Sequence, residues 1–350
     1  MGDKKLVEVN GLTKEFRVNS SIWKNSRAVV HAVTDVTFDI YEGETLALVG
    51  ESGCGKSTLG RLILSLIEPT RGTVTFDGVN MQSLKSEQLR TMRRQMQIIF
   101  QDPYASLNPR WTIRDIVAEP LVTHKVYKTK DEVTARVQEL LKKCGIRPEY
   151  MNRYPHQFSG GQRQRVGIAR ALALNPKLIV CDEPVSALDV SIQSQVLNLL
   201  GDLQKEMALT YLFISHDLSV VRYLSDRVCV MFLGKMCELG VTRDIYDKPL
   251  HPYTRFLLEA VPKPNPRLRK EDKNMLEGDI PSPVNPPSGC RFHTRCPYAK
   301  DICAQQEPAL RSVEGRLSLL SKLQCPRRNG AGIFPPYLRA KPCQRARDAL

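Results

Sequence analysis

The sequence predicts an α/β fold with a parallel-sheet core, a helical insertion and a small Cys-rich C-terminal extension. Short apolar strands alternate with helical patterns through residues 1–240, which is typical of a parallel sheet covered by helices. The strand signal fades over about residues 101–165, and prolines and cysteines accumulate after about residue 260. We therefore expect an α/β domain at residues 1–240, with a helical subdomain at about 101–165, and an extension at 241–350.

Three short apolar segments predict buried strands of the core. They are Thr45–Val49, Leu178–Cys181 and Leu212–Ser215. Helical patterns follow at Leu59–Ile67 and at Arg163–Leu174. Aliphatic runs of this length, separated by helices, are typical of strands that are covered on both faces.

A helix with clear ends is predicted inside the helical subdomain. Thr129 and Glu132 have the spacing of a capping box, in which each side chain accepts a hydrogen bond from the other residue's backbone N–H. Gly145 closes the same helix. The apolar residues between these ends share one face: Val133, Val137, Leu140 and Leu141.

Composition limits where the chain works. The richest apolar run, Leu62–Ile67, is far shorter than the ~18 residues needed to cross a bilayer, and no apolar signal region follows Met1. We expect a cytoplasmic protein, so any membrane spans must come from other chains. The net charge of +14 includes no dense basic run, which favours a solvated surface over a nucleic-acid site.

Residues 50–57 match the pattern G-x-x-x-x-G-K-[ST], directly after a predicted strand and before a predicted helix. The glycines let backbone N–H groups point at phosphates, and the helix adds its positive N-terminal end. Lys56 should reach the β- and γ-phosphates of a bound nucleotide, and Ser57 should ligate Mg²⁺. The nucleotide-binding residues expected here are Gly50, Glu51, Ser52, Gly53, Cys54, Gly55, Lys56, Ser57 and Thr58. We call residues 50–57 the phosphate loop.

Two adjacent carboxylates follow the apolar strand at Leu178–Cys181. Asp182 is placed to hold the Mg²⁺ shell, and Glu183 is placed to orient or deprotonate the attacking water. An apolar strand that ends in Asp-Glu is weak evidence by itself. Together with the phosphate loop, the Asp-Glu pair indicates hydrolysis of a nucleoside triphosphate.

The segment Phe158-Ser-Gly-Gly-Gln162 strongly resembles the Leu-Ser-Gly-Gly-Gln signature of ABC ATPases. The phosphate loop, this signature and Asp182-Glu183 occur in the order of that family, as do Gln101, Ser186-Ala-Leu-Asp189 and His216. The resemblance implies a P-loop ABC ATPase with an N-terminal antiparallel β region. It also implies that two such domains face head to tail and share each ATP.

The resemblance assigns further roles. Gln101 senses the metal, His216 contacts the γ-phosphate and the water, and Asp189 lies at the dimer seam. The signature residues Ser159, Gly160, Gly161 and Gln162 bind the partner's nucleotide. Phe16 is the candidate for stacking on adenine, with Trp23 as the alternative.

Four segments resemble more closely the F-type ATPase subunit of dipeptide and oligopeptide importers: Gly53–Gly60, Ile98–Pro109, Val185–Gln193 and His251–Thr254. That resemblance implies a D-type ATPase partner, two integral-membrane subunits and an external peptide-binding protein. The chain would act peripherally on the cytoplasmic face of the inner membrane. Other small solutes, such as nickel or a glycan, stay open as cargo. A rival interpretation is a non-transport ABC ATPase that acts on nucleic acid or ribosomes.

Five of the ten cysteines lie between Cys290 and Cys343. Cys290, Cys296, Cys303 and Cys325 are candidate ligands of a [4Fe–4S] cluster or of Zn²⁺, with Cys343 or His293 as alternatives to Cys325. The family resemblance favours the cluster. We expect this proline-rich tail to bury little core, so that metal binding would supply its folding energy.

Overall fold

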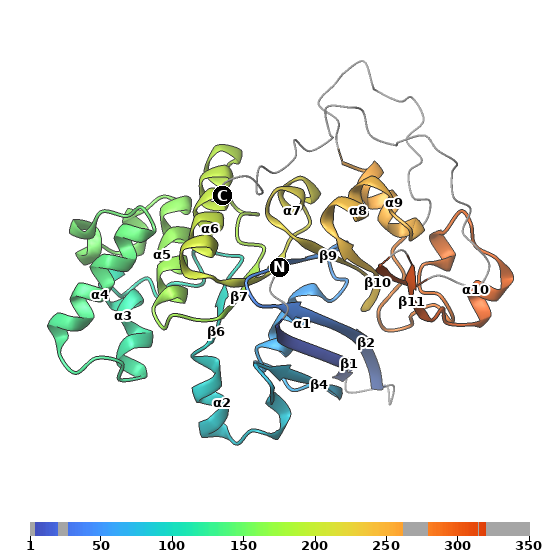
Figure 1. The fold of residues 1–350 in the computed structure, drawn as a ribbon, viewed down its shortest axis with the longest axis horizontal. Helices are drawn as coiled ribbons and strands as arrows, with labels where there is room; N and C mark the ends of the chain where they lie inside the picture. Colours follow the sequence, from blue (N-terminus) through green and yellow to red (C-terminus); the bar gives the residue numbers. More distant parts are fainter. Residues whose placement is uncertain (1–3, 20–26, 262–278, 314, 320–350) are drawn as a thin grey trace, which may run out of the picture.

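The computed structural model describes residues 4–19, 27–261, 279–313 and 315–319. Two sheets organise it (Figure 1). A four-stranded antiparallel sheet has the order β2-β1-β4-β5, and an eight-stranded sheet has the order β11-β12-β10-β9-β3-β8-β7-β6. The α/β fold and the N-terminal antiparallel region are therefore confirmed.

The antiparallel sheet comprises β1 (Lys5–Asn19), β2 (Arg27–Tyr41), β4 (Arg71–Phe76) and β5 (Val79–Asn80). The larger sheet comprises β3 (Thr45–Val49), β6 (Met96–Ile99), β7 (Leu178–Asp182), β8 (Thr210–Ile214), β9 (Arg227–Phe232), β10 (Lys235–Val241), β11 (Leu310–Val313) and β12 (Arg316–Leu319). Neighbours among β9, β3, β8, β7 and β6 pair in parallel. The three predicted strands are confirmed to within two residues at either end.

Helices pack around these sheets. They are α1 (Lys56–Ile63), α2 (Ser86–Arg93), α3 (Ile113–Thr123), α4 (Lys130–Lys143), α5 (Gly160–Leu172), α6 (Val190–Met207), α7 (Leu218–Leu224), α8 (Thr242–Asp247), α9 (Pro252–Glu259) and α10 (Asp301–Gln305). Figure 1 shows α6 to α9 on one side of the larger sheet, and α1 with the antiparallel sheet on the other. Alternate residues of β3 explain the two layers: Leu46 and Leu48 join one hydrophobic cluster, and Ala47 and Val49 join the other.

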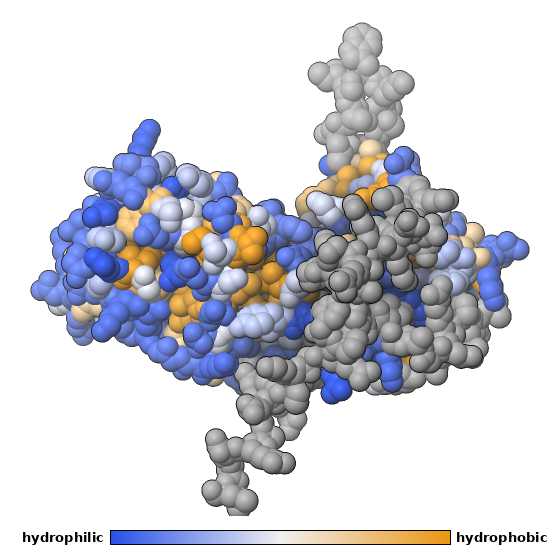
Figure 2. Space-filling view, turned by 90° about the horizontal axis from the view of Figure 1, so that it is seen from above, coloured by the Kyte–Doolittle hydropathy of each residue, from blue (hydrophilic) through white to orange (hydrophobic). Residues whose placement is uncertain are grey.

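Helices α3, α4 and α5 form a group at one end of the molecule (Figure 1). The Thr129–Glu132 capping box is present, and the four apolar residues predicted for the helix face are buried. Gly145 follows the helix with φ +70°, a left-handed conformation that glycine adopts without strain. Figure 2 shows hydrophobic residues gathered over this end of the molecule, between hydrophilic ones.

Two predicted helices have different ends. The pattern at Leu59–Ile67 forms α1, which starts at Lys56 and stops at Ile63 because Ser65 has φ +52° and breaks the helix. The pattern at Arg163–Leu174 forms α5, which starts earlier because Ser159 caps it.

The extension is part of the larger sheet. The proposed boundary at residue 240 falls inside β10, and β12 pairs with β10 in antiparallel register. The side chain of Phe292 is buried at 1% exposure, and Arg316 is buried at 3%. The expectation that this region buries little core is therefore wrong for its described residues. A composition rich in proline did not reveal the long-range pairing with β10.

Candidate functional site

Four of the predicted site residues each follow a parallel strand of the larger sheet. Gly50 follows β3, Gln101 follows β6, Glu183 follows β7 and His216 follows β8. Because these strands are parallel, their carboxyl ends meet at one edge, where α/β proteins commonly bind ligands. We call this edge the catalytic edge.

The phosphate loop needs glycine at two positions because backbone lies against it. A Cβ on Gly50 would come within 2.1 Å of the carbonyl oxygen of Met231, and one on Gly55 within 2.1 Å of that of Ala32. Gly55 also has φ +102°. Both contacts are with backbone, so a larger residue would displace the loop from β2 or β9.

Lys56 is buried at 5% exposure. Its Nζ donates to the carbonyl oxygens of Gly50 at 2.8 Å and Glu51 at 3.0 Å. The ammonium thus lies inside the curve of the phosphate loop. A phosphate placed there would exchange these neutral acceptors for a charged one, which makes a stronger hydrogen bond.

Ser57 and Asp182 lie together at the start of α1 and the end of β7. The Ser57 hydroxyl donates to Asp182 Oδ1 at 2.7 Å, and Asp182 is buried at 5% exposure. A hydroxyl and a carboxylate are hard oxygen donors, the kind that Mg²⁺ prefers when substrate phosphates complete its shell. The donor set therefore fits Mg²⁺.

The Glu183 carboxylate is held from two sides. Its Oε2 accepts from Gln101 Nε2 at 3.0 Å and lies 3.2 Å from His216 Nδ1. Glu183 has φ +47°, an uncommon conformation for a residue with a side chain, and its N–H donates to the carbonyl of Ile214. The structure thus brings the predicted base, metal sensor and histidine into one cluster.

The signature segment does not join this cluster within the described part of the chain. Ser159 and Gln162 form a capping box at the start of α5, with Gln162 N–H donating to Ser159 Oγ at 3.3 Å and Ser159 N–H to Gln162 Oε1 at 3.0 Å. Gly160 and Gly161 pack toward the side chains of Leu188 and Ile192. Figure 1 shows α5 well apart from α1. Asp189 is exposed just before α6.

The adenine position stays a prediction. Phe16 is 39% exposed on β1, and the Lys14 ammonium lies 5.1 Å from its ring centroid. The alternative, Trp23, lies outside the described residues.

Two residues that contact the phosphate loop were not singled out from the sequence as nucleotide-site residues. The hydroxyl of Tyr253, on α9, accepts from the Glu51 N–H at 2.9 Å. Arg295 Nη1 donates to both carboxylate oxygens of Glu51, at 3.2 and 3.0 Å. Tyr253 belongs to the His251–Thr254 segment, which indicated only a family. Arg295 carries no sequence signal, because 244 residues separate it from Glu51.

The cysteine region forms a compact turn. Cys290 N–H donates to the Cys303 carbonyl at 2.7 Å, and Cys296 follows the short helix His293–Arg295. No group of three or more Cys, His, Asp or Glu side chains in the described ranges is arranged to hold a metal ion. The described thiols therefore do not by themselves fit a cluster, and Cys325 and Cys343 lie outside the described residues.

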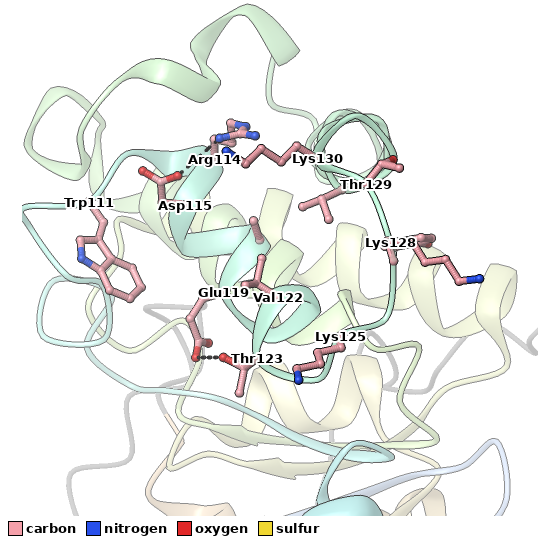
Figure 3. A pocket seen from close by; sticks show the side chains of 13 residues that line it. Trp111, Arg114, Asp115, Glu119, Val122, Thr123, Lys125, Lys128, Thr129 and Lys130 are labelled. Atoms are coloured by element: carbon pink, nitrogen blue, oxygen red, sulfur yellow. Dashed lines mark hydrogen bonds and ion pairs between the residues drawn. The ribbon is translucent and has the colours of Figure 1, made fainter.

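A groove of about 1030 Å³ lies between α3 and α4 (Figure 3). Acidic side chains, basic side chains and one indole line it: Trp111, Arg114, Asp115, Glu119, Lys125, Lys128 and Lys130.

Within the described residues, no helix is both long and apolar enough to cross a membrane.

Comparison with known proteins decides the family. A family model described as ABC transporter matches residues 33–186, and one described as oligopeptide/dipeptide transporter, C-terminal region, matches residues 237–303. The chain is 54% identical over 310 residues to the oligopeptide transport ATP-binding protein AppF of Bacillus subtilis strain 168, covering 88% of this chain and 94% of AppF. The chain belongs to the ABC transporter family. The predicted family is confirmed.

A second relative and a solved structure support the same family. The oligopeptide transport ATP-binding protein OppF of Escherichia coli K12 is 53% identical over 313 residues, covering 88% of this chain and 93% of OppF. A solved structure of an ATP-binding cassette dimer, in a post-hydrolysis state with ADP and Pi, has a TM-score of 0.61 at 32% identity. That likeness covers 68% of this chain and 99% of the cassette.

Proposed function

We propose that this chain hydrolyses ATP to power the import of dipeptides or oligopeptides. The observation that carries the proposal is the cluster of Gln101, Glu183 and His216 at the catalytic edge. The relatives that span almost the whole chain, AppF and OppF, are oligopeptide transport ATP-binding proteins.

The chemistry follows from where the groups lie. Lys56 and the backbone N–H groups of the phosphate loop bind the phosphates. Ser57 and Asp182 would hold Mg²⁺, which would neutralise charge that develops on the phosphates. Glu183 accepts a proton from the attacking water or orients it. Gln101 and His216 position the Glu183 carboxylate, because both contact its Oε2 atom.

The ATPase works as a dimer. The signature Ser159–Gln162 lies apart from the phosphate loop of its own chain, so a second cassette has to supply that segment. We propose a D-type ATPase subunit as this partner. Val190, which starts α6 directly after Asp189, is 79% exposed and suits such a seam.

Asp102–Asn108 is the proposed docking segment for the membrane subunits. Its Asn108 carbonyl accepts from the N–H of Trp111, which lines the groove between α3 and α4. Asp102 holds the turn by accepting from the N–H groups of Tyr104 and Ala105. The guanidinium of Arg163 lies 3.5 Å from the centroid of the Tyr104 ring and donates to the Phe158 carbonyl. Movement of the docking segment would therefore reach the signature through Arg163.

The remaining partners complete an importer. We propose two integral-membrane permease subunits and an external peptide-binding protein that reaches the ATPase only through them. The chain would be bound peripherally at the cytoplasmic face of the inner membrane.

A [4Fe–4S] cluster in the extension stays a prediction. The turn that ties Cys290 to Cys303 supports it, although the described thiols alone do not form a site. Its role would be structural. Protein purified anaerobically should contain about four irons per chain if the cluster is present. One zinc or no metal would contradict the prediction.

Reconstitution tests the function. The chain should be purified with its partner ATPase and permease subunits and placed in proteoliposomes with the binding protein. We expect ATP-dependent uptake of a labelled tripeptide, and no uptake with Lys56→Ala. Uptake of nickel or a glycan, without uptake of the tripeptide, would show that the transported solute is not a peptide. ATPase activity that responds to nucleic acid and not to permease would favour the non-transport alternative.

A further inference from the structure

We propose that Tyr253 and Arg295 are positioning residues for ATP binding, and that they link the order of the C-terminal extension to nucleotide affinity through Glu51. The inference rests on the proposed role of the phosphate loop. It adds two residues outside the ATPase motifs, and a function for the extension that does not depend on a metal.

Glu51 is engaged at each of its polar groups. Its N–H donates to the Tyr253 hydroxyl at 2.9 Å, and its carbonyl accepts from Lys56 Nζ at 3.0 Å. Its carboxylate accepts from Arg295 at 3.2 and 3.0 Å. The Glu51 carbonyl also accepts from the Cys54 N–H at 3.2 Å, within the phosphate loop. The extension thus holds the N–H and the carboxylate of Glu51, and the carbonyl contacts the phosphate-binding lysine.

Tyr253 is held rigidly. It is fully buried, and its ring centroid lies 4.8 Å from that of Phe232 on β9 and 5.3 Å from that of Phe292 in the extension. The same two phenylalanines contact each other edge to face at 5.3 Å. A hydroxyl on such a ring has little freedom, so it fixes where the Glu51 backbone can lie.

The Arg295–Glu51 pair is shielded from water. The exposed fractions of the side chains are 8% for Arg295 and 21% for Glu51. A pair of this kind interacts more strongly than a surface pair, and removing one partner leaves a partly buried charge unpaired. Without Arg295, the Glu51 carboxylate would stand one residue from Gly50 in a loop that has to bind the negative phosphates of ATP.

Arg295 is placed by the compact turn of the extension. It ends the short helix His293–Arg295, whose ends are held by hydrogen bonds from His293 N–H to the Cys290 carbonyl and from Cys296 N–H to the His293 carbonyl. If this turn loosens, the arginine leaves Glu51. Because linkage is reciprocal, ATP that favours the held loop must also favour the ordered turn.

The test is a double-mutant cycle on the affinity for MgATP. Arg295→Gln should raise the Kd and KM by roughly fivefold to tenfold, at the lower end of typical coupling between sites, with kcat within about twofold. Adding Glu51→Gln should restore most of the affinity, because it removes the unpaired charge. Tyr253→Phe, which keeps the ring, should weaken binding in the same direction and stands in if Arg295→Gln does not fold.

Arg316→Gln is the matched control. Arg316 is more deeply buried than Arg295, with 3% of its side chain exposed. It donates to the carbonyls of Asp244 and Lys248 and lies 3.8 Å from the Glu238 carboxylate, and these three residues are outside the phosphate loop. Arg316→Gln should lower the free energy of unfolding and leave the Kd for MgATP unchanged. An equal rise in Kd for Arg295→Gln and Arg316→Gln, or no rescue by Glu51→Gln, would overturn the proposal.

Hydrogen exchange gives the reciprocal readout. Saturating MgATP should slow amide exchange in residues 290–303 of the wild-type chain, and should not do so in Arg295→Gln. Unchanged exchange in the wild type would contradict the linkage. A separate result would contradict the proposed ATP site itself. If Lys56→Ala bound MgATP as tightly as the wild type does, both the proposed function and this inference would be wrong.

Discussion

The catalytic edge and the C-terminal extension meet at Glu51, but they are built differently. At the catalytic edge, Gln101, Glu183 and His216 each follow their own strand by one or two positions. In the extension, Arg295 reaches Glu51 across 244 residues, and β12 joins the larger sheet by pairing with β10. One region is assembled by the regular geometry of parallel strands, and the other by individual long-range contacts.

This difference teaches which substitutions each region should tolerate. Residues of the catalytic edge stay in place when one of them changes, because the sheet holds the others, so such changes should alter chemistry and spare stability. The extension is held by its aromatic cluster and buried arginines, so changes there should alter stability first. Three predictions test this contrast and a fourth tests the docking segment, from the largest expected effect to the smallest.

Phe292→Ala should be the most damaging change. Phe292 is buried against Phe232 and Tyr253, and a Phe→Ala cavity costs about 3–5 kcal/mol of the free energy of unfolding. Urea unfolding would measure it. Ile280→Ala, at a residue of the extension that is 51% exposed, is the control and should cost less than about 0.5 kcal/mol. A loss below about 1 kcal/mol for Phe292→Ala would mean that the extension is not part of the core.

Glu183→Gln should lower ATP hydrolysis by ~10²-fold or more, the scale of losing a general base. ATP affinity should stay near that of the wild type, and the ATP-bound dimer should accumulate, because only the water activation is lost. Single-turnover hydrolysis measures the loss of rate, equilibrium ATP binding measures the affinity, and size-exclusion chromatography with ATP measures the dimer. Glu149→Gln, at an exposed carboxylate in the helical group, serves as the control. More than about half of the activity remaining would exclude Glu183 as the base.

His251 should make stability fall in acid. Burial lowers its pKa from 6.5 to about 4, so the unfolded chain takes up a proton before the native chain does. Stability should therefore drop as the pH falls from about 6.5 to about 4, by up to about 3 kcal/mol. His251→Asn keeps an acceptor for the Tyr253 N–H at the start of α9 and should flatten this part of the profile. An unchanged slope would assign the effect to other groups.

Tyr104→Ala should separate transport from hydrolysis. Tyr104 is 64% exposed in the docking segment, and its ring contacts the guanidinium of Arg163. Peptide uptake should therefore fall by about tenfold while basal ATPase activity changes by less than about twofold. Paired uptake and phosphate-release assays on the same proteoliposomes measure both. Equal losses would place Tyr104 in the ATP site instead.

The sequence by itself determined the fold and the local order of the catalytic edge. The phosphate loop, Asp182 and Glu183 are recognisable because a short motif accompanies an apolar strand. Gln101 and His216 are recognisable because the family resemblance places them in the same order along the chain. Parallel pairing then brings such strand ends together without further information. Even the ends of α4 could be predicted, since Thr129 and Glu132 form hydrogen bonds with each other's backbone and Gly145 follows the last turn directly.

Only the tertiary structure decided what the extension does. Composition suggested a tail that needs a metal to fold, whereas its described residues pair with β10, bury Phe292 and hold Glu51 through Tyr253 and Arg295. The residues that make these contacts are not separated by a characteristic number of positions in the sequence, so no motif marks them. A side chain that acts on a partner far away in sequence leaves no periodic or local pattern, because its role depends on where the folded backbone brings that partner.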